Sequence, residues 1–370
     1  MNRFERQVIL QGFGTAGQGK LQKAKVLVIG AGGLGCPALL YLAAAGVGII
    51  GIADGDIVSV SNLNRQIIYG ENDVGKRKAE VASGYLQKKY SDITIESIPE
   101  FITSSNALSI IGKYDLVLDG SDNFPTRYII NDACVLLNKP LISGAIYQHE
   151  GQVAVLNVVS KNDLSANYRD IYPEPPGADE IPNCDETGVL GALPGIIGAM
   201  QAAEAIKVLS GYGTPLINKI LFYDLKSPAF YETEIISNPL SKKLIPVDAA
   251  AFVQADYSIA CSSVNFVNWE QALTMQQKNT GEVMLVDVRE SDEQPVPEDF
   301  DYINIPFSVL QKEYHQLLLA DTLLLFCQSG VRSVRAAQVL KTIFPEKIIS
   351  SVKGGIMDPM SPIHHQYHET

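Results

Sequence analysis

The chain has 370 residues, enough for two or three domains, and its 46% hydrophobic and 19% charged residues are ordinary for globular proteins. With 29 Lys and Arg against 41 Asp and Glu, its net charge of −12 argues against non-specific binding to nucleic acids or anionic membranes. Five scattered cysteines without a C-x-x-C pair exclude a disulfide scaffold and a zinc ribbon.

The sequence shows no secretory or membrane-spanning segment that we recognise. Residues 1–6 are charged, unlike a signal peptide. The longest apolar stretch, around residues 37–52, is interrupted by glycines and falls short of the roughly 20 residues that a membrane span needs. We therefore expect a soluble, cytoplasmic protein.

Strands and helices alternate along the first 209 residues. Residues 25–29 form a short apolar run that ends in glycines, which is typical of a buried parallel strand. The same patterns predict strands at 48–53, 93–98, 115–119, 140–143 and 152–159, and helices at 35–45, 76–90, 125–137 and 188–209. This order predicts a Rossmann-like, doubly wound and mostly parallel α/β sheet, interrupted by a long polar loop at 160–185.

A second, smaller α/β domain is predicted after a weakly patterned segment. We expect a first domain at 1–240, a linker at 241–262 and a second domain at 263–370. The second domain is indicated by apolar strands at 283–287 and 323–326 and by a helix after Gly330.

A nucleotide-binding motif follows the first predicted strand. Gly30-Ala31-Gly32-Gly33-Leu34-Gly35 matches G-x-G-x-x-G and opens a helix, and Asp54 ends the next strand. Glycines let the backbone approach phosphates, the helix N-terminus favours negative charge, and the acid can bond ribose hydroxyls. The alternative is that these glycines serve only tight packing between the helix and the strand.

Charged residues follow this motif in a pattern that a dehydrogenase does not need. Ser61-Asn62-Leu63-Asn64-Arg65-Gln66 follows Asp54, Lys78 comes later, and Asp122 and Asn123 follow another strand. Two cations and an acid at the carboxyl edge of the sheet suit a triphosphate and Mg²⁺. An NAD-dependent oxidoreductase would explain the glycines and Asp54, but neither Arg65 nor Lys78.

Several blocks in one order make residues 4–237 resemble the MoeB/ThiF family of adenylyltransferases, which includes the ubiquitin-activating enzymes. The matching blocks are Arg6-Gln7, the glycine motif, Asp54 with Ser61 to Gln66, Lys78, Ser121-Asp122-Asn123, and Cys184-Asp185-Glu186-Thr187-Gly188-Val189-Leu190-Gly191. The resemblance implies ATP-dependent adenylation of the C-terminal glycine of a small ubiquitin-like sulfur carrier that ends in Gly-Gly.

The resemblance also implies a role for each matching residue. It implies that Gly33 and its neighbours Gly30, Gly32 and Gly35 approach the nucleotide and that Asp54 holds the ribose. It implies that phosphates are contacted by Asn62, Arg65 and Lys78, and that Asp122, with Asn123 beside it, binds Mg²⁺. It also implies that Arg6 reaches the ATP of the other subunit of a homodimer. The carrier's carboxylate attacks the α-phosphate and pyrophosphate leaves, so this step needs no side-chain nucleophile.

Cys184 lies on the predicted loop, close to a helix N-terminus that favours a lowered thiol pKa. In relatives the matching position forms a covalent link to the carrier or relays sulfur; the alternative is a cysteine tolerated in a loop. We expect Cys36, Cys134 and Cys261 to be packing residues.

Bacterial relatives usually hold a structural zinc with two C-x-x-C pairs. Here Asn167-Tyr168-Arg169-Asp170 and Ser241-Lys242-Lys243-Leu244 occupy those places, so we expect no structural zinc.

The C-terminal part carries a second candidate site. Phe326-Cys327-Gln328-Ser329-Gly330-Val331-Arg332-Ser333 lies between a strand and a helix, where backbone N–H groups stabilise a thiolate or persulfide. Four residues separate Cys327 from Arg332, whereas tyrosine phosphatases need five. With Val286 to Glu290, Ile303 to Pro306 and Lys353 to Gly355, this loop makes residues 264–360 resemble the rhodanese sulfurtransferases. A non-catalytic rhodanese fold is the alternative.

These resemblances together predict an adenylyltransferase that also transfers sulfur through a persulfide on Cys327. The predicted cofactors are ATP and Mg²⁺, and the predicted sulfur donor is thiosulfate or the persulfide of a cysteine desulfurase. The carrier's pathway (molybdopterin, thiamine or tRNA thiolation) stays open. The remaining alternatives are the oxidoreductase and a non-enzymatic adaptor for ubiquitin-like proteins.

Overall fold

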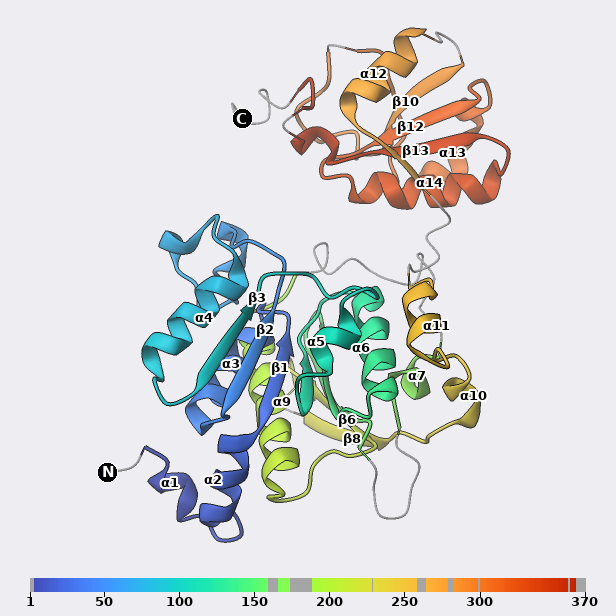
Figure 1. Cartoon of the computed structure of the whole chain (residues 1–370). Helices are drawn as coiled ribbons and strands as arrows, with labels where there is room; N and C mark the ends of the chain where they lie inside the picture. Colours follow the sequence, from blue (N-terminus) through green and yellow to red (C-terminus); the bar gives the residue numbers. More distant parts are fainter. Residues whose placement is uncertain are drawn as a thin grey trace. The chain divides into compact units, whose positions relative to one another are not determined.

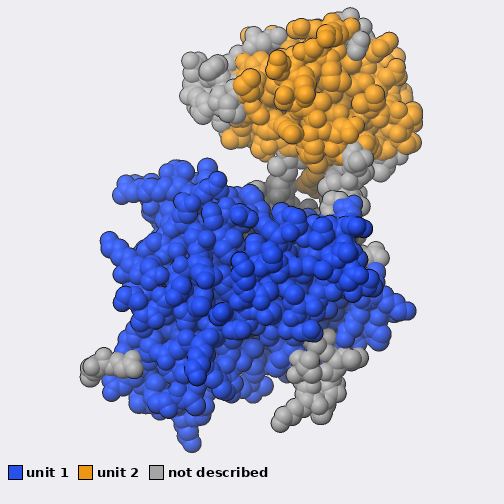
Figure 2. Space-filling view, in the orientation of Figure 1, with its two compact units in different colours: residues 1–175, 182–258 blue, residues 176–181, 259–370 orange. Residues whose placement is uncertain are grey.

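The computed structural model describes residues 3–158, 166–173, 188–227, 229–257, 264–278, 282–298, 300–358 and 360–363. Two compact units divide the chain: residues 1–175 with 182–258 (unit 1), and residues 259–370 with 176–181 (unit 2) (Figure 2). Each unit has its own sheet and its own hydrophobic clusters.

Unit 1 is built on an eight-stranded sheet in the order β3-β2-β1-β4-β5-β6-β7-β8 (Figure 1). The first five strands in this order are parallel, and β6, β7 and β8 join antiparallel at one side. The strands are β1 (Lys25–Ile29), β2 (Ile49–Ala53), β3 (Thr94–Ile98), β4 (Leu116–Asp119), β5 (Leu141–Tyr147), β6 (Glu150–Leu156), β7 (Lys219–Asp224) and β8 (Ala229–Glu234). The predicted Rossmann-like, mostly parallel sheet is confirmed.

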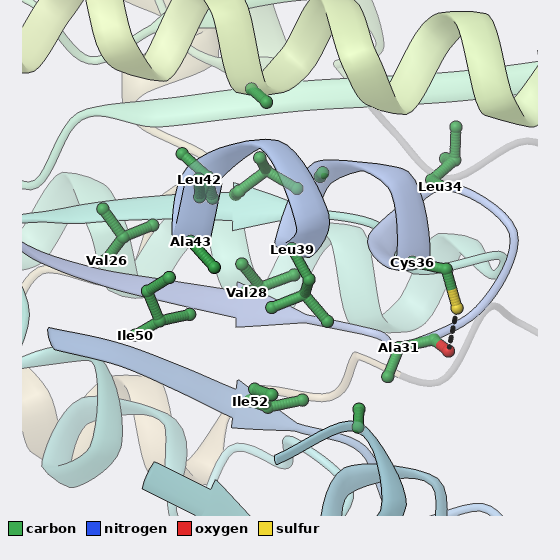
Figure 3. Close-up of a cluster of buried hydrophobic side chains, with 14 of the residues drawn as sticks. Val26, Val28, Ala31, Leu34, Cys36, Leu39, Leu42, Ala43, Ile50 and Ile52 are labelled. Atoms are coloured by element: carbon green, nitrogen blue, oxygen red, sulfur yellow. Dashed lines mark hydrogen bonds between the residues drawn. The ribbon is translucent and has the colours of Figure 1, made fainter. Parts of the chain in front are cut away.

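Helices cover both faces of this sheet because successive strand residues point to opposite faces. Val26 and Val28 of β1 pack in the cluster formed with α3 (Gly35–Ala45), α4 (Lys78–Lys89) and α9 (Ala192–Ser210), and Figure 3 shows α3 over this strand. Leu27 and Ile29 face the other cluster, with α5 (Ala107–Ile111), α6 (Phe124–Leu136) and α7 (Tyr168–Ile171). The short helices α1 (Glu5–Val8) and α2 (Gly14–Lys23) precede β1.

Helix α9 is long and apolar enough, by length and composition alone, to cross a membrane. In unit 1 it packs against the sheet and α3, and Leu193, Ile197, Ala202 and Ala205 are buried in the cluster that contains α3. Its apolar composition is therefore explained by its place in the core of unit 1.

The segment predicted as a linker differs from the prediction over its first part. Residues 239–257 belong to unit 1 and carry α10 (Pro239–Lys242) and α11 (Ala249–Gln254). Phe252 is fully buried in the cluster that contains α6, and the hydroxyl of Tyr257 donates to Asp132 at 3.1 Å. Two aromatic side chains spaced five residues apart give too little periodicity to predict this docking. Residues 258–263 lie outside the described residues.

Unit 2 contains a five-stranded parallel sheet in the order β11-β10-β12-β13-β9. Its strands are β9 (Asn265–Val267), β10 (Val283–Asp287), β11 (Ile303–Asn304), β12 (Thr322–Phe326) and β13 (Ile348–Val352), and its helices are α12 (Trp269–Lys278), α13 (Leu310–Glu313) and α14 (Val331–Ile343). Leu323 and Leu325 pack on one face of the sheet and Leu324 and Phe326 on the other. Unit 2 is therefore a three-layer α/β unit, and its assignment to the rhodanese fold stays a prediction.

Candidate functional site

The glycine motif lies where the strand order of unit 1 reverses, between β1 and β4. Gly30 has a φ of +89°, and a Cβ there would lie 2.7 Å from the carbonyl oxygen of Gly120, which follows β4. The N–H of Gly120 donates to the carbonyl of Ile29 at 2.8 Å, so the two loops touch. A Cβ at Gly35 would collide with the carbonyl oxygen of Gly30, which explains the glycine at the start of α3. Ligands of doubly wound sheets bind at such a switch point.

Asp54 follows β2 and supports this loop. Its Oδ2 accepts from the N–H of Ala31 at 2.7 Å, and its Oδ1 accepts from the N–H of Asp56 at 2.8 Å. An ionised carboxylate has about four acceptor sites, so Asp54 retains capacity for ribose hydroxyls. Burial raises its pKa above the ordinary value, partly opposed by these two hydrogen bonds.

Lys78 begins α4 with its side chain 7% exposed, and its Nζ contacts Oδ2 of Asp56 at 3.1 Å. The hydroxyl of Tyr69 donates to the carbonyl of Ala31 at 2.8 Å and to that of Lys78 at 3.3 Å. Tyr69 thereby links the glycine loop to the start of α4. Neither Tyr69 nor Asp56 belongs to a recognisable sequence pattern, so neither was predicted to lie at the site.

The block at 61–66 lies beside the glycine loop. The Nη1 of Arg65 donates to the carbonyl of Ser61 at 2.8 Å and to Oδ1 of Asn64 at 3.0 Å, while Oδ1 of Asn62 accepts from the N–H of Ser59. A Cβ at Gly33 would lie 3.6 Å from Cγ of Arg65. In this structure the Arg65 guanidinium is therefore held by its own loop, and the stem of the side chain lies close to Gly33.

Leu63 and Gln66 connect the same block to the core. Leu63 packs against the cluster that contains α3, and Gln66 is 4% exposed. A Cβ at Gly32 would lie 3.7 Å from Nε2 of Gln66, and the Oε1 of Gln66 is buried without a hydrogen-bond partner among the described residues. Gln66, the last residue of the 61–66 block, is thus a further residue beside the glycines, although no role was predicted for it.

Asp122 stands on the loop after β4. It is exposed, and its Oδ1 has a long contact of 3.4 Å with the amide of Asn123, which also caps α6 by accepting from the N–H of Thr126. The buried guanidinium of Arg127 donates to the carbonyls of Ser121 at 2.8 Å and of Gly144 at 3.0 Å, and so fixes the backbone before Asp122. Asp122 thus presents carboxylate oxygens, the ligand type that Mg²⁺ prefers.

Arg6 is not brought to this site within one chain. It is exposed on α1, which contacts the C-terminal end of α3: the side-chain amide of Gln7 donates to the carbonyl of Ala45 at 3.2 Å. The glycine loop lies at the opposite end of α3, about 15 Å away at 1.5 Å per residue.

The second candidate site surrounds Cys327, directly after β12. Its Sγ is nearly fully buried and accepts from the N–H of Ser333 at 3.4 Å, near the N-terminus of α14. Gly330 has a φ of +87° and turns the chain into that helix. The predicted closing segment lies beneath the loop, since the N–H of Ile356 donates to the carbonyl of Cys327 at 2.9 Å and a Cβ at Gly355 would collide with that carbonyl. The indole of Trp269 donates to the carbonyl of Gly355 at 2.7 Å.

Arg332 of the same loop is paired with Glu293, which was not predicted from the sequence to lie at this site. Its Nη2 donates to Oε2 of Glu293 at 2.7 Å and its Nη1 donates to Oε1 of the same carboxylate. This bond lowers the pKa of Glu293 below its ordinary value. The guanidinium is thus engaged by a carboxylate within unit 2.

The two segments that occupy the places of the zinc ligands of bacterial relatives contact each other through polar groups. The Oδ1 of Asp170 accepts from the N–H of Asn238 at 2.7 Å and from the hydroxyl of Ser241. Beside it, Arg169 donates to both oxygens of the buried Asp132, at 2.9 and 2.8 Å. Across the part of the chain that the structure describes, no group of three or more His, Cys, Asp or Glu side chains could hold a metal ion.

The remaining cysteines divide into buried thiols and thiols outside the described residues. Cys36 and Cys134 are fully buried, and burial raises the pKa of Cys36 to about 12 and that of Cys134 further. Both thiols therefore stay protonated near neutral pH. Cys184 and Cys261 lie outside the described residues.

A doubly wound sheet with a glycine loop, an acid after β2 and polar side chains after β4 defines a nucleotide-binding α/β protein. Residues 4–243 match the ThiF family, and the chain belongs to that family.

Two relatives show how far the similarity extends. The probable adenylyltransferase/sulfurtransferase MoeZ of Mycobacterium tuberculosis is 39% identical over 365 residues, which cover 96% of this chain and 91% of that protein. The sulfur carrier protein adenylyltransferase of Thermus thermophilus is 49% identical over 240 residues, which cover 65% of this chain and 89% of that protein. The predicted class of enzyme, an adenylyltransferase with sulfurtransferase activity, is thereby confirmed.

A solved structure is similar to about two thirds of the chain. The crystal structure of E. coli MccB with ATP is 26% identical, with a TM-score of 0.55, and the similarity covers 65% of this chain and 73% of that one.

Proposed function

We propose that this chain uses ATP to adenylate the C-terminal glycine of a small ubiquitin-like sulfur carrier, and that it transfers sulfur through a persulfide on Cys327. The observation that supports the first half is that the glycine loop bonds Asp54 and touches the loop after β4, which carries Asp122, at the switch point of the sheet. The names of the relatives and the ATP complex of MccB support it.

Each side chain at this edge has a chemical task in the proposal. Asp54 accepts hydrogen bonds from ribose hydroxyls while it holds the glycine loop, and the N-terminus of α3 faces phosphate. Arg65 and Lys78 exchange their present partners, Ser61 and Asp56, for phosphate oxygens. Asp122 would hold a Mg²⁺ ion, which would supply charge neutralisation on the phosphates. The carrier's own carboxylate attacks the α-phosphate, so the chain provides positioning and charge.

In the second half, the Cys327 thiolate attacks the outer sulfur of a donor. A new bond joins Sγ to that sulfur, the donor's own bond to it breaks, and the leaving group departs with the electron pair. The N–H of Ser333 and the N-terminus of α14 stabilise the anionic sulfur. The strand-to-helix turn at Cys327 and the sulfurtransferase name of the full-length relative support this half.

A homodimer is part of the proposal, because Arg6 is remote from the glycine loop of its own chain. In a dimer that pairs α1 of one subunit with the nucleotide edge of the other, Arg6 contacts the partner's ATP. We also propose a cytoplasmic location.

Carrier-dependent ATP–pyrophosphate exchange tests the adenylation site. Asp122→Asn should lower the exchange rate by about a hundredfold or more, because it removes the charge of the metal ligand. Asp115→Asn is the matched control: Asp115 lies at the opposite end of β4, where its Oδ2 accepts from the N–H of Lys25, and its substitution should leave exchange unchanged.

Normal exchange by a folded Asp122→Asn protein would disprove the site. The absence of exchange in the unmodified chain would favour a non-enzymatic adaptor. Mixing subunits tests the dimer with the same assay: Arg6→Ala and Asp122→Asn proteins, each impaired alone, should recover exchange together, because one mixed site then has both residues.

A further inference from the structure

The ion pair between Glu293 and Arg332 sits at the sulfur-handling loop. Arg332 is the second residue of α14 and lies five positions after Cys327. Both of its terminal nitrogens donate to the Glu293 carboxylate, whose Oε1 also accepts from the N–H of Glu290 at 2.8 Å. The side chains of Arg332 and Glu293 are only 22% and 25% exposed. The two Arg332 nitrogens and the N–H of Glu290 together hold the carboxylate in place.

The sheet of unit 2 explains how the two residues meet. Strands β10 and β12 are parallel neighbours, with Asp287 opposite Phe326. The residues after each strand therefore emerge at the same edge. Glu293 comes from the loop after β10, and the Cys327 loop comes directly after β12. The parallel pairing of β10 and β12 therefore places the Glu293 carboxylate next to the Cys327 loop.

The pair changes the charge that the loop offers to a sulfur donor. An unpaired arginine beside the thiol would attract an anion such as thiosulfate, which carries two negative charges. Here the guanidinium already has an anionic partner, and a second anion must compete for it and meet repulsion from Glu293. The lowered pKa of Glu293 means that this competition persists throughout the neutral range.

We propose that Glu293 is a specificity-determining residue of the sulfurtransferase site. Because Glu293 is paired with Arg332, it weakens the binding of dianionic sulfur donors. The loop therefore prefers donors of lower charge, such as the persulfide of a protein cysteine. The inference rests on the proposed sulfur transfer at Cys327, and it adds the charge class of the donor.

Two small donors of different charge test this inference. Thiosulfate is a dianion; when Cys327 takes its outer sulfur, the S–S bond of the donor breaks and sulfite leaves with the electron pair. Benzenethiosulfonate is a monoanion that gives up its outer sulfur in the same way, with benzenesulfinate as the leaving group. In both assays cyanide then removes the sulfur from Cys327 as thiocyanate and returns the thiolate.

The experiment compares kcat and KM of the full-length chain with those of Glu293→Gln. Removing the carboxylate's charge should lower KM for thiosulfate about fivefold, the upper range of an exposed ion pair, and should lower KM for benzenethiosulfonate by less. We expect kcat to change by less than about twofold, since Cys327 and Ser333 are untouched. Glu290→Gln is the matched control on the same loop, because Glu290 bonds Ser308 instead of Arg332, and its KM values should not change.

A KM for thiosulfate that is unchanged or raised in Glu293→Gln would overturn the inference, because the ion pair would then only order the loop. An equal decrease in Glu290→Gln would also overturn it, since net charge would be the cause. Glu293→Asp keeps the charge and should keep the high KM, which provides a second variant if Glu293→Gln folds poorly. Mass spectrometry of Cys327 separates the two proposals: if no variant gains sulfur from either donor, the sulfur transfer itself is disproved.

Discussion

Replacing Arg169 with Met removes the guanidinium bonded to the buried carboxylate of Asp132. Asp132 is fully buried on α6 and accepts from Arg169, from the amide of Asn131 at 3.0 Å and from the hydroxyl of Tyr257 at 3.1 Å. Met retains most of the apolar stem of Arg169. The variant therefore tests the charge, because the carboxylate stays in place with two neutral donors.

Breaking one side of a buried ion pair costs about 3–5 kcal/mol, since a charge is left in an apolar environment. For a unit of about 250 residues this corresponds to a decrease in Tm of about 6–20 °C. Tyr257→Phe removes a single hydrogen bond and should cost about 1 kcal/mol. Combining Arg169→Met with Asp132→Asn removes both charges and should recover much of the loss.

Calorimetry of the full chain measures these shifts. ATP with Mg²⁺ identifies the transition of unit 1, because a ligand raises the Tm of the unit that binds it. The reasoning is refuted if Arg169→Met shifts that transition by less than about 2 °C, or if the double variant is no more stable than the single one.

Two further predictions concern metal content and the division of labour between the units. Metal analysis of the purified chain, free of any tag, should find no stoichiometric zinc, because Asp170 and Ser241 make polar contacts where bacterial relatives have the thiolates of their C-x-x-C pairs. About one tightly held zinc per chain would contradict this. Cys327→Ala should end sulfur transfer and spare ATP–pyrophosphate exchange, because adenylation needs no thiol. Loss of exchange in a folded Cys327→Ala protein, or sulfur transfer that depends on Cys184 instead, would contradict this assignment.

The strands and helices predicted best from the sequence are those with clear hydrophobic periodicity and with glycines at their ends. The strand at 25–29 is confirmed as β1, and the helix predicted at 35–45 is confirmed as α3. The helix predicted from residue 76 starts at Lys78, because the N–H of Val58 bonds the carbonyl of Lys76 and extends the preceding loop. The four-residue helix α7 within the predicted long loop gave no periodic signal.

Contacts between distant segments explain what the sequence did not predict at the sites. Tyr69 bonds Ala31 across 38 positions. Arg127 bonds the carbonyls of Ser121, after β4, and of Gly144, in β5. Glu293 meets Arg332 across 39 positions, so the loop expected to stabilise an anionic sulfur has a carboxylate bonded to its arginine. Such pairings depend on strand order, which local patterns specify only coarsely.

Trp269 is the chain's single tryptophan, and it belongs to unit 2. Its indole is bonded to Gly355, whose backbone lies against the carbonyl of Cys327, and its ring lies 5.2 Å from that of Phe326, the residue before Cys327. Selectively excited tryptophan emission therefore originates beside the sulfur-handling loop of unit 2. Trp269 is therefore an intrinsic optical probe next to Cys327, and we expect its emission to change when sulfur arrives on or leaves that thiol.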